Sequence, residues 1–203
     1  MFREKLYKKL ATALEEVNIE TPTPLQARCL SKINAGSDVI GIGPAGSGKS
    51  TLITITAIQK LQRAIEDMPK VLILVGNSES GNAMKEQFRQ FAKNTDLRIT
   101  TAFEDGDIND QNAEIYDGTD ILIGTAKRIL DLYFANGLNL NKIKLFVIDD
   151  AELMIKNSWQ GQIDRLALSL PKCQHLVFTT GLTDKIEKLI SKFIIAPFVV
   201  EVG

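Results

Sequence analysis

The chain has 203 residues, of which 44% are hydrophobic and 24% charged, and its net charge at pH 7 is −1. These values are typical of one globular domain with a sizeable core, and no apolar run reaches the roughly 20 residues that a membrane span requires. The near-neutral charge excludes a generally basic coat for nucleic acid but allows a local basic groove. Two cysteines without metal-ligand spacing, and a start that lacks a signal peptide's apolar run, predict a cytoplasmic protein without membrane contact.

Short β-rich runs alternate with helical patterns along the chain. The helical patterns follow an amphipathic amino-terminal helix at 3–16, whose stripe from Leu6 to Val17 is expected to pack on the domain, and they include 50–66, 79–93, 126–135 and 183–193. The expected strands are mostly continuously apolar, as in strands covered on both faces; they cover 38–43, 70–76, 97–103, 120–124, 144–149, 175–180 and 198–202. This alternation predicts an α/β fold, with a doubly wound, mostly parallel sheet flanked by helices.

The segment GPAGSGKST follows the first expected strand and matches the phosphate-loop pattern G-x-x-x-x-G-K-[ST]. Its glycines let backbone N–H groups turn inward around a phosphate, and the next helix adds its positive amino terminus. Lys49 is expected to contact the β- and γ-phosphates and to serve catalysis, and the Ser50 hydroxyl is expected to bind Mg²⁺. The loop residues predicted to bind nucleotide are Pro44, Ala45, Gly46, Ser47, Gly48, Lys49, Ser50 and Thr51.

Three acids, Asp149, Asp150 and Glu152, follow the apolar run expected at 144–149. Carboxylates this close repel one another unless a cation lies opposite. Asp149 is therefore predicted to be the second anchor of Mg²⁺, and Asp150 to orient the attacking water or accept its proton. This assignment places the strand beside the strand that carries the phosphate loop.

Other classes of phosphate-loop protein lack their motifs here. The closest string to the guanine motif N-K-x-D is NKIK (141–144), the transporter motif L-S-G-G-Q is missing, and no arginine-rich lid is visible. Upstream, two prolines in NIETPTPLQ (18–26) precede a helix and fix the direction of Gln26. The Gln26 amide offers a donor and an acceptor side by side, which matches an adenine edge.

At this point the sequence resembles the DEAD-box RNA helicases. NIETPTPLQ is similar to the family's adenine-reading motif G-F-x-x-P-T-P-I-Q, GPAGSGKST to A-x-x-G-x-G-K-T, and VIDDAE to V-L-D-E-A-D. ILIGTAKRILDL (121–132) is similar to the segment with T-P-G-R, which grips the nucleic-acid backbone, and VFTTG (177–181) stands where the family has S-A-T. The resemblance covers residues 2–203.

The resemblance implies a RecA-like domain over residues 1–203 that binds ATP and Mg²⁺, as the amino-terminal half of an ATP-dependent RNA helicase. ATP hydrolysis would be coupled to RNA binding or unwinding. RNA, single- or double-stranded and without sequence preference, would contact Thr125, Lys127 and Arg128, and Ile19 would lie against the adenine. A second RecA-like domain, absent from this chain, would supply an arginine finger, so the domain alone is expected to hydrolyse ATP weakly.

Several positions depart from the family pattern. Ile19 replaces an aromatic residue, Ser78 replaces an arginine, and FEDGD (103–107) places acids where a Gly-Gly pair would approach RNA. Asp150 replaces a glutamate, and TTG at 179–181 replaces S-A-T. These changes predict a weak grip on RNA and inefficient unwinding. Two alternatives stay open: a nucleotide-gated RNA-binding clamp or scaffold with little turnover, and a DNA-acting phosphate-loop ATPase.

Overall fold

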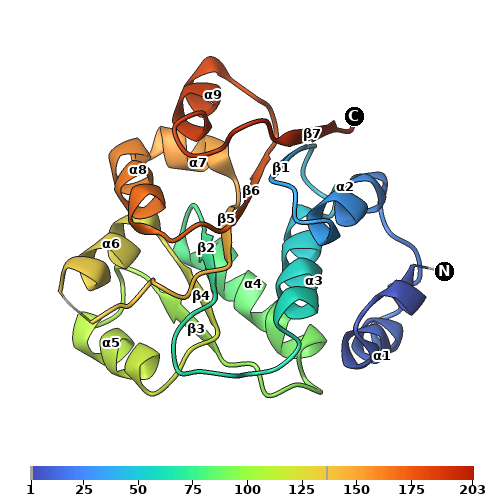
Figure 1. Ribbon diagram of the computed structural model, residues 1–203, viewed down its shortest axis with the longest axis horizontal. Helices are drawn as coiled ribbons and strands as arrows, with labels where there is room; N and C mark the ends of the chain where they lie inside the picture. Colours follow the sequence, from blue (N-terminus) through green and yellow to red (C-terminus); the bar gives the residue numbers. More distant parts are fainter. Residues whose placement is uncertain (1, 136) are drawn as a thin grey trace.

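The computed structural model describes residues 2–135 and 137–203, which form one seven-stranded sheet between two layers of helices (Figure 1). The strands lie in the order β3-β4-β2-β5-β6-β1-β7 and every neighbouring pair is parallel. Their bounds are β1 (Val39–Ile42), β2 (Val71–Leu74), β3 (Ile99–Ala102), β4 (Ile121–Gly124), β5 (Leu145–Ile148), β6 (Gln174–Thr179) and β7 (Phe198–Glu201). The predicted fold class is confirmed, and each expected strand is present.

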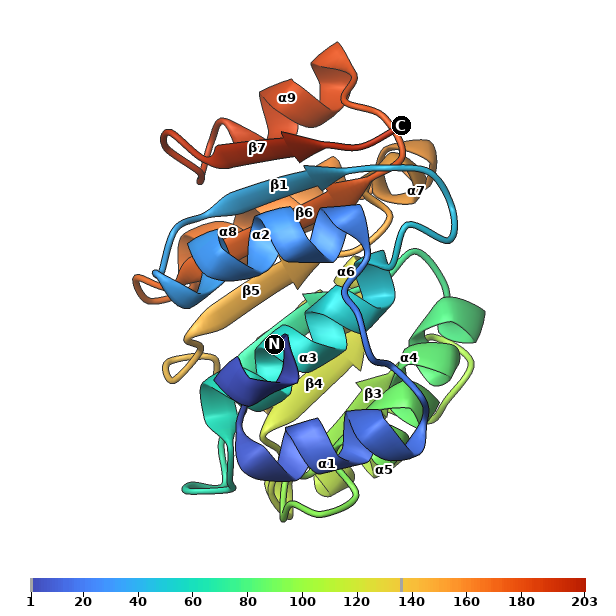
Figure 2. The ribbon, with the colours of Figure 1, turned by 90° about the vertical axis from the view of Figure 1, so that its right-hand side faces the viewer.

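The helices divide between the two faces of the sheet. Helices α1 to α4 cover one face, where α1, α2 and α3 lie in front of the strands in Figure 2, and α5 to α9 cover the other. Their bounds are η1 (Arg3–Lys5), α1 (Lys8–Glu16), α2 (Pro24–Asn34), α3 (Lys49–Leu61), α4 (Ser78–Phe91), α5 (Ile108–Tyr116), α6 (Ala126–Phe134), α7 (Ala151–Lys156), α8 (Gln160–Ser169) and α9 (Asp184–Ile190).

Alternate side chains of each central strand enter two separate apolar cores. Val71 and Ile73 of β2 face the first helix layer, whereas Leu72 and Leu74 face the second. All four side chains are completely buried. Because both faces are covered, the strand has no solvent-facing side that would need polar residues, which explains why its sequence reads as an unbroken apolar run.

The start of α2 shows how local sequence fixes a backbone direction. The Thr23 hydroxyl accepts a hydrogen bond from the Gln26 N–H at 3.3 Å, and the Gln26 side-chain oxygen accepts one from the Thr23 N–H at 3.0 Å. This reciprocal pair is a capping box, and Pro24 occupies the first helical position, where a missing N–H does no harm. The two prolines therefore start a helix, as expected.

The amino-terminal helix expected at 3–16 is wrong as one continuous element. The chain is extended at Leu6 (φ −94°, ψ 158°), between η1 and the start of α1. The Tyr7 N–H donates to Gln59 Oε1 of α3 at 2.6 Å, so a contact with a distant helix takes the place of a helical hydrogen bond. Val17, expected on the packed stripe, is 37% exposed.

The strand order corrects a second expectation. We expected β5 to lie directly beside β1, but β6 lies between them and pairs with both. The carboxyl ends of β1 and β5 are therefore separated by the end of a third strand. Any contact between the residues that follow β1 and those that follow β5 must cross the end of β6.

Gly41 in β1 packs tightly against the ring of Phe178 in the first core. A substitution at this position tests that packing. A β-carbon at Gly41 would lie 2.6 Å from two ring atoms of Phe178, so we expect Gly41→Ala to lower the free energy of unfolding by about 1–3 kcal/mol. Gly161 in α8 is the control, because nothing lies within 4 Å of a β-carbon there. Gly161→Ala should raise the free energy of unfolding by about 0.5–1 kcal/mol through helix propensity. Urea denaturation measures both, and equal effects would contradict the packing.

Candidate functional site

The loop at 43–48 leaves the carboxyl end of β1 and leads into the first turn of α3. Gly46 and Gly48 adopt left-handed backbone conformations, with φ of 82° and 89°, which glycine reaches without the strain that a β-carbon brings. A β-carbon at Gly48 would also lie 2.4 Å from Gln26 Nε2. Pro44, Ala45 and Gly46 form the exposed rim of the loop.

Lys49 folds its side chain back into this loop. Its ammonium donates to the backbone oxygens of Gly43 at 2.8 Å and Pro44 at 3.0 Å, and the residue is only 7% exposed. The Ser47 hydroxyl is buried and has no hydrogen-bond partner among the described residues. A buried cation that contacts neutral carbonyls, beside an unsatisfied hydroxyl and a helix amino terminus, fits the anionic phosphates of a nucleotide.

Ser50 and Asp149 meet across the end of β6. The Ser50 hydroxyl donates to Asp149 Oδ2 at 3.3 Å, although 99 residues separate the two in sequence. A hydroxyl and one carboxylate suit Mg²⁺, which prefers oxygen ligands and keeps waters and phosphate oxygens as its remaining ligands. No group of three or more histidine, cysteine, aspartate or glutamate residues gathers as a metal site in the described part of the chain. The pair thus supplies two side-chain oxygen atoms of the kind that Mg²⁺ takes together with water and phosphate oxygens.

The Asp149 carboxyl is 3% exposed, and this burial raises its pKa to about 7. The charge of Asp150 raises the pKa further, whereas the Ser50 hydrogen bond and the charge of Lys49 oppose the rise. The pKa of Asp150 is also raised, by burial and then by the charge of Glu152, with Lys49 again opposing. The two acids thus form an electrostatically strained pair that a divalent cation would relieve.

Asp150 has a left-handed backbone, with φ of 54°, at the turn from β5 into α7. This conformation is uncommon for a residue other than glycine and is found often at functional sites. The Asp150 N–H donates to Asp149 Oδ1 at 3.1 Å, and the Asp150 residue is half-buried, whereas Asp149 is buried. The turn therefore leaves the Asp150 carboxylate more accessible to water than that of Asp149.

Glu152 has a structural role that was not predicted from the sequence. It accepts hydrogen bonds from the hydroxyls of Thr179 and Thr180, each at 2.8 Å, and from the Thr180 N–H at 3.2 Å. Burial acts to raise the Glu152 pKa, but hydrogen bonds from its own backbone and from the two threonines outweigh burial and lower the pKa. The third acid thus ties α7 to the end of β6.

Gln26 is engaged within the protein. Its side-chain oxygen takes part in the capping box, its Nε2 donates to the Gly48 carbonyl at 3.0 Å, and the residue is 3% exposed. Each amide atom keeps capacity for one more hydrogen bond, so contact with adenine would have to use that remainder. Ile19 and Thr51 lie at the adjacent hollow of about 510 Å³, whose lining is Asn18, Ile19, Glu20, Thr21, Thr23, Gln26, Gly46, Gly48 and Thr51.

Two of the three residues expected to contact RNA form hydrogen bonds with the loop at 103–107. The Thr125 hydroxyl donates to Glu104 Oε2 at 2.6 Å, and Thr125 is 2% exposed. The Arg128 guanidinium donates to the carbonyls of Glu104 and Gly106 at 3.0 and 3.1 Å and to Gln111 Oε1 at 3.2 Å. Arg128 therefore holds this loop and does not present a free guanidinium at the surface. Lys127 is the exposed member of the three.

A second hollow, of about 500 Å³, lies at the carboxyl ends of β2, β3 and β4. Its lining is Gly76, Asn77, Ser78, Phe103, Glu104, Asp105, Thr125, Asn157 and Trp159. Two carboxylates and no cationic side chain contribute to this lining. The hollow therefore offers a phosphate backbone repulsion more than attraction.

The sequence matches the family model for the DEAD/DEAH box helicase over residues 23–189. The pre-mRNA-processing ATP-dependent RNA helicase PRP5 of Meyerozyma guilliermondii is 29% identical over 203 residues, which cover 96% of this chain and 24% of that protein. The probable ATP-dependent RNA helicase DDX46 of Danio rerio is 29% identical over 96% of this chain and 20% of that protein. The chain thus spans about a quarter or less of the length of these relatives.

Two solved structures share the fold. A DEAD box protein from Methanococcus jannaschii superposes with a TM-score of 0.93 at 21% identity, over 98% of this chain and 55% of that chain. A hypothetical ATP-dependent RNA helicase from Sulfolobus tokodaii gives a TM-score of 0.88 at 20% identity, over 97% of this chain and 57% of that chain. The RecA-like architecture predicted from the sequence is confirmed.

The buried Asp149 carboxyl makes stability depend on pH when metal is absent. Its pKa is about 7 in the folded state against about 3.9 in an unfolded chain. Between these values the folded state binds more protons, so this group's contribution to the free energy of unfolding falls as the pH rises. Asp149→Asn removes the titration, and the variant should exceed the parent in stability by about 1–3 kcal/mol at about pH 8 but not at about pH 4.

Urea denaturation across this pH range, in buffer with EDTA, measures the difference. Asp105→Asn, which alters an exposed carboxyl, is the control and should follow the parent at every pH. A gain for Asp149→Asn that is equally large at both ends of the range would contradict the raised pKa.

Proposed function

The chain belongs to the DEAD/DEAH box helicase family, and from this premise we propose that it is the ATP- and Mg²⁺-binding domain of an ATP-dependent RNA helicase. The observation that carries the proposal is the cradle around Lys49, with the Ser50–Asp149 contact at its edge. A buried ammonium whose partners are loop carbonyls exchanges those partners readily for the stronger acceptors of a phosphate. The relatives' printed names, which describe ATP-dependent RNA helicases, support the same activity.

In this proposal Lys49, Ser50 and Asp149 have separate tasks. Lys49 and the first turn of α3 bind the phosphates and balance their charge. Ser50 and Asp149 would hold Mg²⁺, which would supply charge neutralisation at the transferred phosphoryl group. Asp149 must be ionised for this task. Burial raises the pKa of its carboxyl to about 7, and a bound cation would favour the deprotonated form.

Asp150 is the proposed base that orients the attacking water. Its carboxyl is half-buried beside Asp149, and its raised pKa makes it a stronger proton acceptor than an ordinary aspartate. The neighbouring Glu152 anchors the same turn to Thr179 and Thr180. A change in the position of Asp150 is therefore transmitted to the end of β6.

We further propose that RNA passes over the carboxyl ends of β3 and β4, where Thr125, Lys127 and Arg128 lie. Lys127 is exposed, whereas Thr125 and Arg128 are bound to the loop at 103–107, and this arrangement supports a weak interaction in the domain alone. A second RecA-like domain is the proposed partner that completes the ATP and RNA sites. The chain spans 55% of the solved Methanococcus jannaschii structure, which leaves room there for such a domain.

A second candidate function, the nucleotide-gated clamp or scaffold with little turnover, is favoured by the engagement of Arg128 and Thr125 and by the shorter Asp150. No particular observation favours a DNA-acting ATPase. The cytoplasmic location stays a prediction. Of the described helices, none is both long and apolar enough to cross a membrane.

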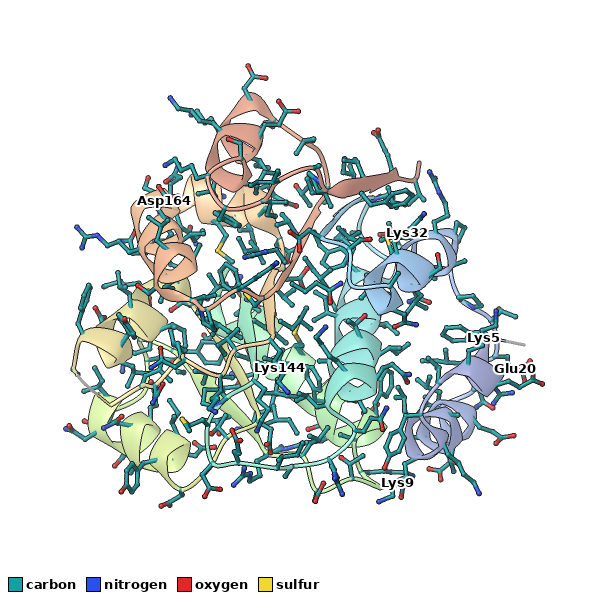
Figure 3. The ribbon with its side chains drawn as sticks, viewed as in Figure 1. Lys5, Lys9, Glu20, Lys32, Lys144 and Asp164 are labelled. Atoms are coloured by element: carbon teal, nitrogen blue, oxygen red, sulfur yellow. The ribbon has the colours of Figure 1, made fainter. Side chains whose placement is uncertain are left out.

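Lys49→Ala should weaken Mg²⁺–ATP binding by about 10- to 100-fold, because it removes a charge-assisted contact of roughly 1.5–3 kcal/mol. The fold should persist, since the ammonium contacts the loop and not the apolar cores. Isothermal titration calorimetry measures the affinity, and circular dichroism checks the fold. Lys32→Ala is the matched control, because Lys32, labelled in Figure 3, is exposed in the last turn of α2, whereas the loop contacts Thr23 and Gln26 at the start of that helix. Equal affinities for the two variants would exclude the loop as the nucleotide site.

Asp150→Asn should nearly abolish RNA-stimulated ATP hydrolysis while ATP still binds, because the amide cannot accept the proton of water. Asp150→Glu should keep or raise the rate, since it extends the carboxylate by about one methylene, and a displacement of about 1 Å can change rates ~10²-fold. The measurement is steady-state ATPase activity, with saturating RNA, of this domain joined to its second domain. Undiminished hydrolysis by Asp150→Asn would remove Asp150 as the base. Negligible stimulation of the parent by RNA would favour the nucleotide-gated clamp. Stimulation by DNA and not by RNA would favour the DNA-acting phosphate-loop ATPase.

A further inference from the structure

Gln87 of α4 forms a hydrogen-bonded chain with two threonines of α3. Its Nε2 donates to the Thr51 hydroxyl oxygen at 3.1 Å, and its Oε1 accepts from the Thr54 hydroxyl at 2.9 Å. The surrounding contact between the two helices is apolar and includes Ile55 and Phe88. A polar chain inside such a contact is costly to leave unsatisfied, so the amide of Gln87 is expected to keep hydrogen-bond partners on α3.

The direction of these hydrogen bonds sets the role of the Thr51 hydroxyl. A side-chain amide nitrogen can only donate, so the Thr51 oxygen is the acceptor in its contact with Gln87. The hydroxyl hydrogen of Thr51 is consequently not used toward α4 and remains available on another side of the oxygen. Because the Thr51 oxygen accepts from Gln87 on the side of α4, its hydrogen can be donated to a group on another side.

Thr51 is also part of the nucleotide hollow. It is half-buried, it contributes to the lining together with Ile19 and Gln26, and it lies in the first turn of α3, where backbone N–H groups attract anions. Gln87 belongs to no part of that lining. Its amide nitrogen contacts the lining through the Thr51 hydroxyl, whereas its amide oxygen contacts Thr54, whose hydroxyl also lies 3.0 Å from the Ser50 carbonyl.

We propose that Gln87 is a positioning residue, which holds the Thr51 hydroxyl as a hydrogen-bond donor to the phosphates of the bound nucleotide. The proposal rests on the proposed nucleotide site and adds to it a residue from a different helix. Without Gln87 the Thr51 hydroxyl is free to rotate, and its hydrogen can turn to other acceptors. Binding of phosphate would then have to restrict this rotation, and the entropy cost would lower the affinity.

The test is a double-mutant cycle on Mg²⁺–ADP binding, measured by calorimetry. Gln87→Met keeps the length of the side chain but removes its donor and acceptor, and Thr51→Val removes the hydroxyl. We expect each variant to weaken binding about three- to tenfold, and the double variant to be no weaker than Thr51→Val, because Gln87 acts only through that hydroxyl. Thr51→Ser restores a hydroxyl and should recover most of the affinity that Thr51→Val loses. Gln90→Met, an exposed glutamine on the same helix, is the control.

Two further measurements, adenosine affinity and urea denaturation, separate positioning from a structural role. Adenosine affinity should be the same for the parent and for Gln87→Met, since adenosine has no phosphate to accept the hydrogen bond. Urea denaturation reports the cost to the helix contact; a loss of stability with unchanged ADP affinity would show that Gln87 only joins the helices and would overturn the proposal. Losses that multiply in the double variant would overturn it as well. A parent and a Gln90→Met variant that both fail to bind ADP would overturn the nucleotide site itself.

Discussion

The hydrogen bond from Ser50 to Asp149 joins two segments that lie 99 residues apart, and it is possible because all strands of the sheet run in the same direction. Parallel polarity places every carboxyl end at one edge, where the loops after β1, β5 and β6 meet. The amino termini of the following helices point to the same edge and make it electropositive. The buried acids and Lys49 thus share one electrostatic environment, and a bound cation or anion at this edge changes the energy of each group.

Local patterns in the sequence predicted most helices and strands, and long-range contacts account for the places where the structure differs from those predictions. Strands buried on both faces carry unbroken apolar runs, so β2 and β5 could be located directly. The loop at 43–48 could be located from the spacing of its glycines and Lys49, which is characteristic of phosphate loops. Strand order has no such local signal, which is why the insertion of β6 between β1 and β5 was missed. The break at Leu6 depends on Gln59 of α3, a contact that no property of the segment 3–16 encodes.

The same distinction applies to the candidate site. Residue types and spacing made Lys49, Ser50 and Asp149 candidates, and the structure brings them to one place at the loop and the strand end. For Gln26 and Arg128 the side chains could be picked out from the sequence, but their partners in Gly48 and in the loop at 103–107 could not. A ligand that recruits either side chain must offer better hydrogen bonds than the internal ones, and the net gain is then only the difference between the two.

Thr179 at the end of β6 touches two segments by two different routes. Its carbonyl accepts a hydrogen bond from the Gly43 N–H at 3.0 Å, and its hydroxyl donates to Glu152 at 2.8 Å. The first bond belongs to the sheet and survives any substitution of the side chain, whereas the second depends on the hydroxyl. Thr179 therefore connects the loop after β1 through its backbone and the turn after β5 through its side chain, so a substitution that removes the hydroxyl would cut the second connection and leave the first in place.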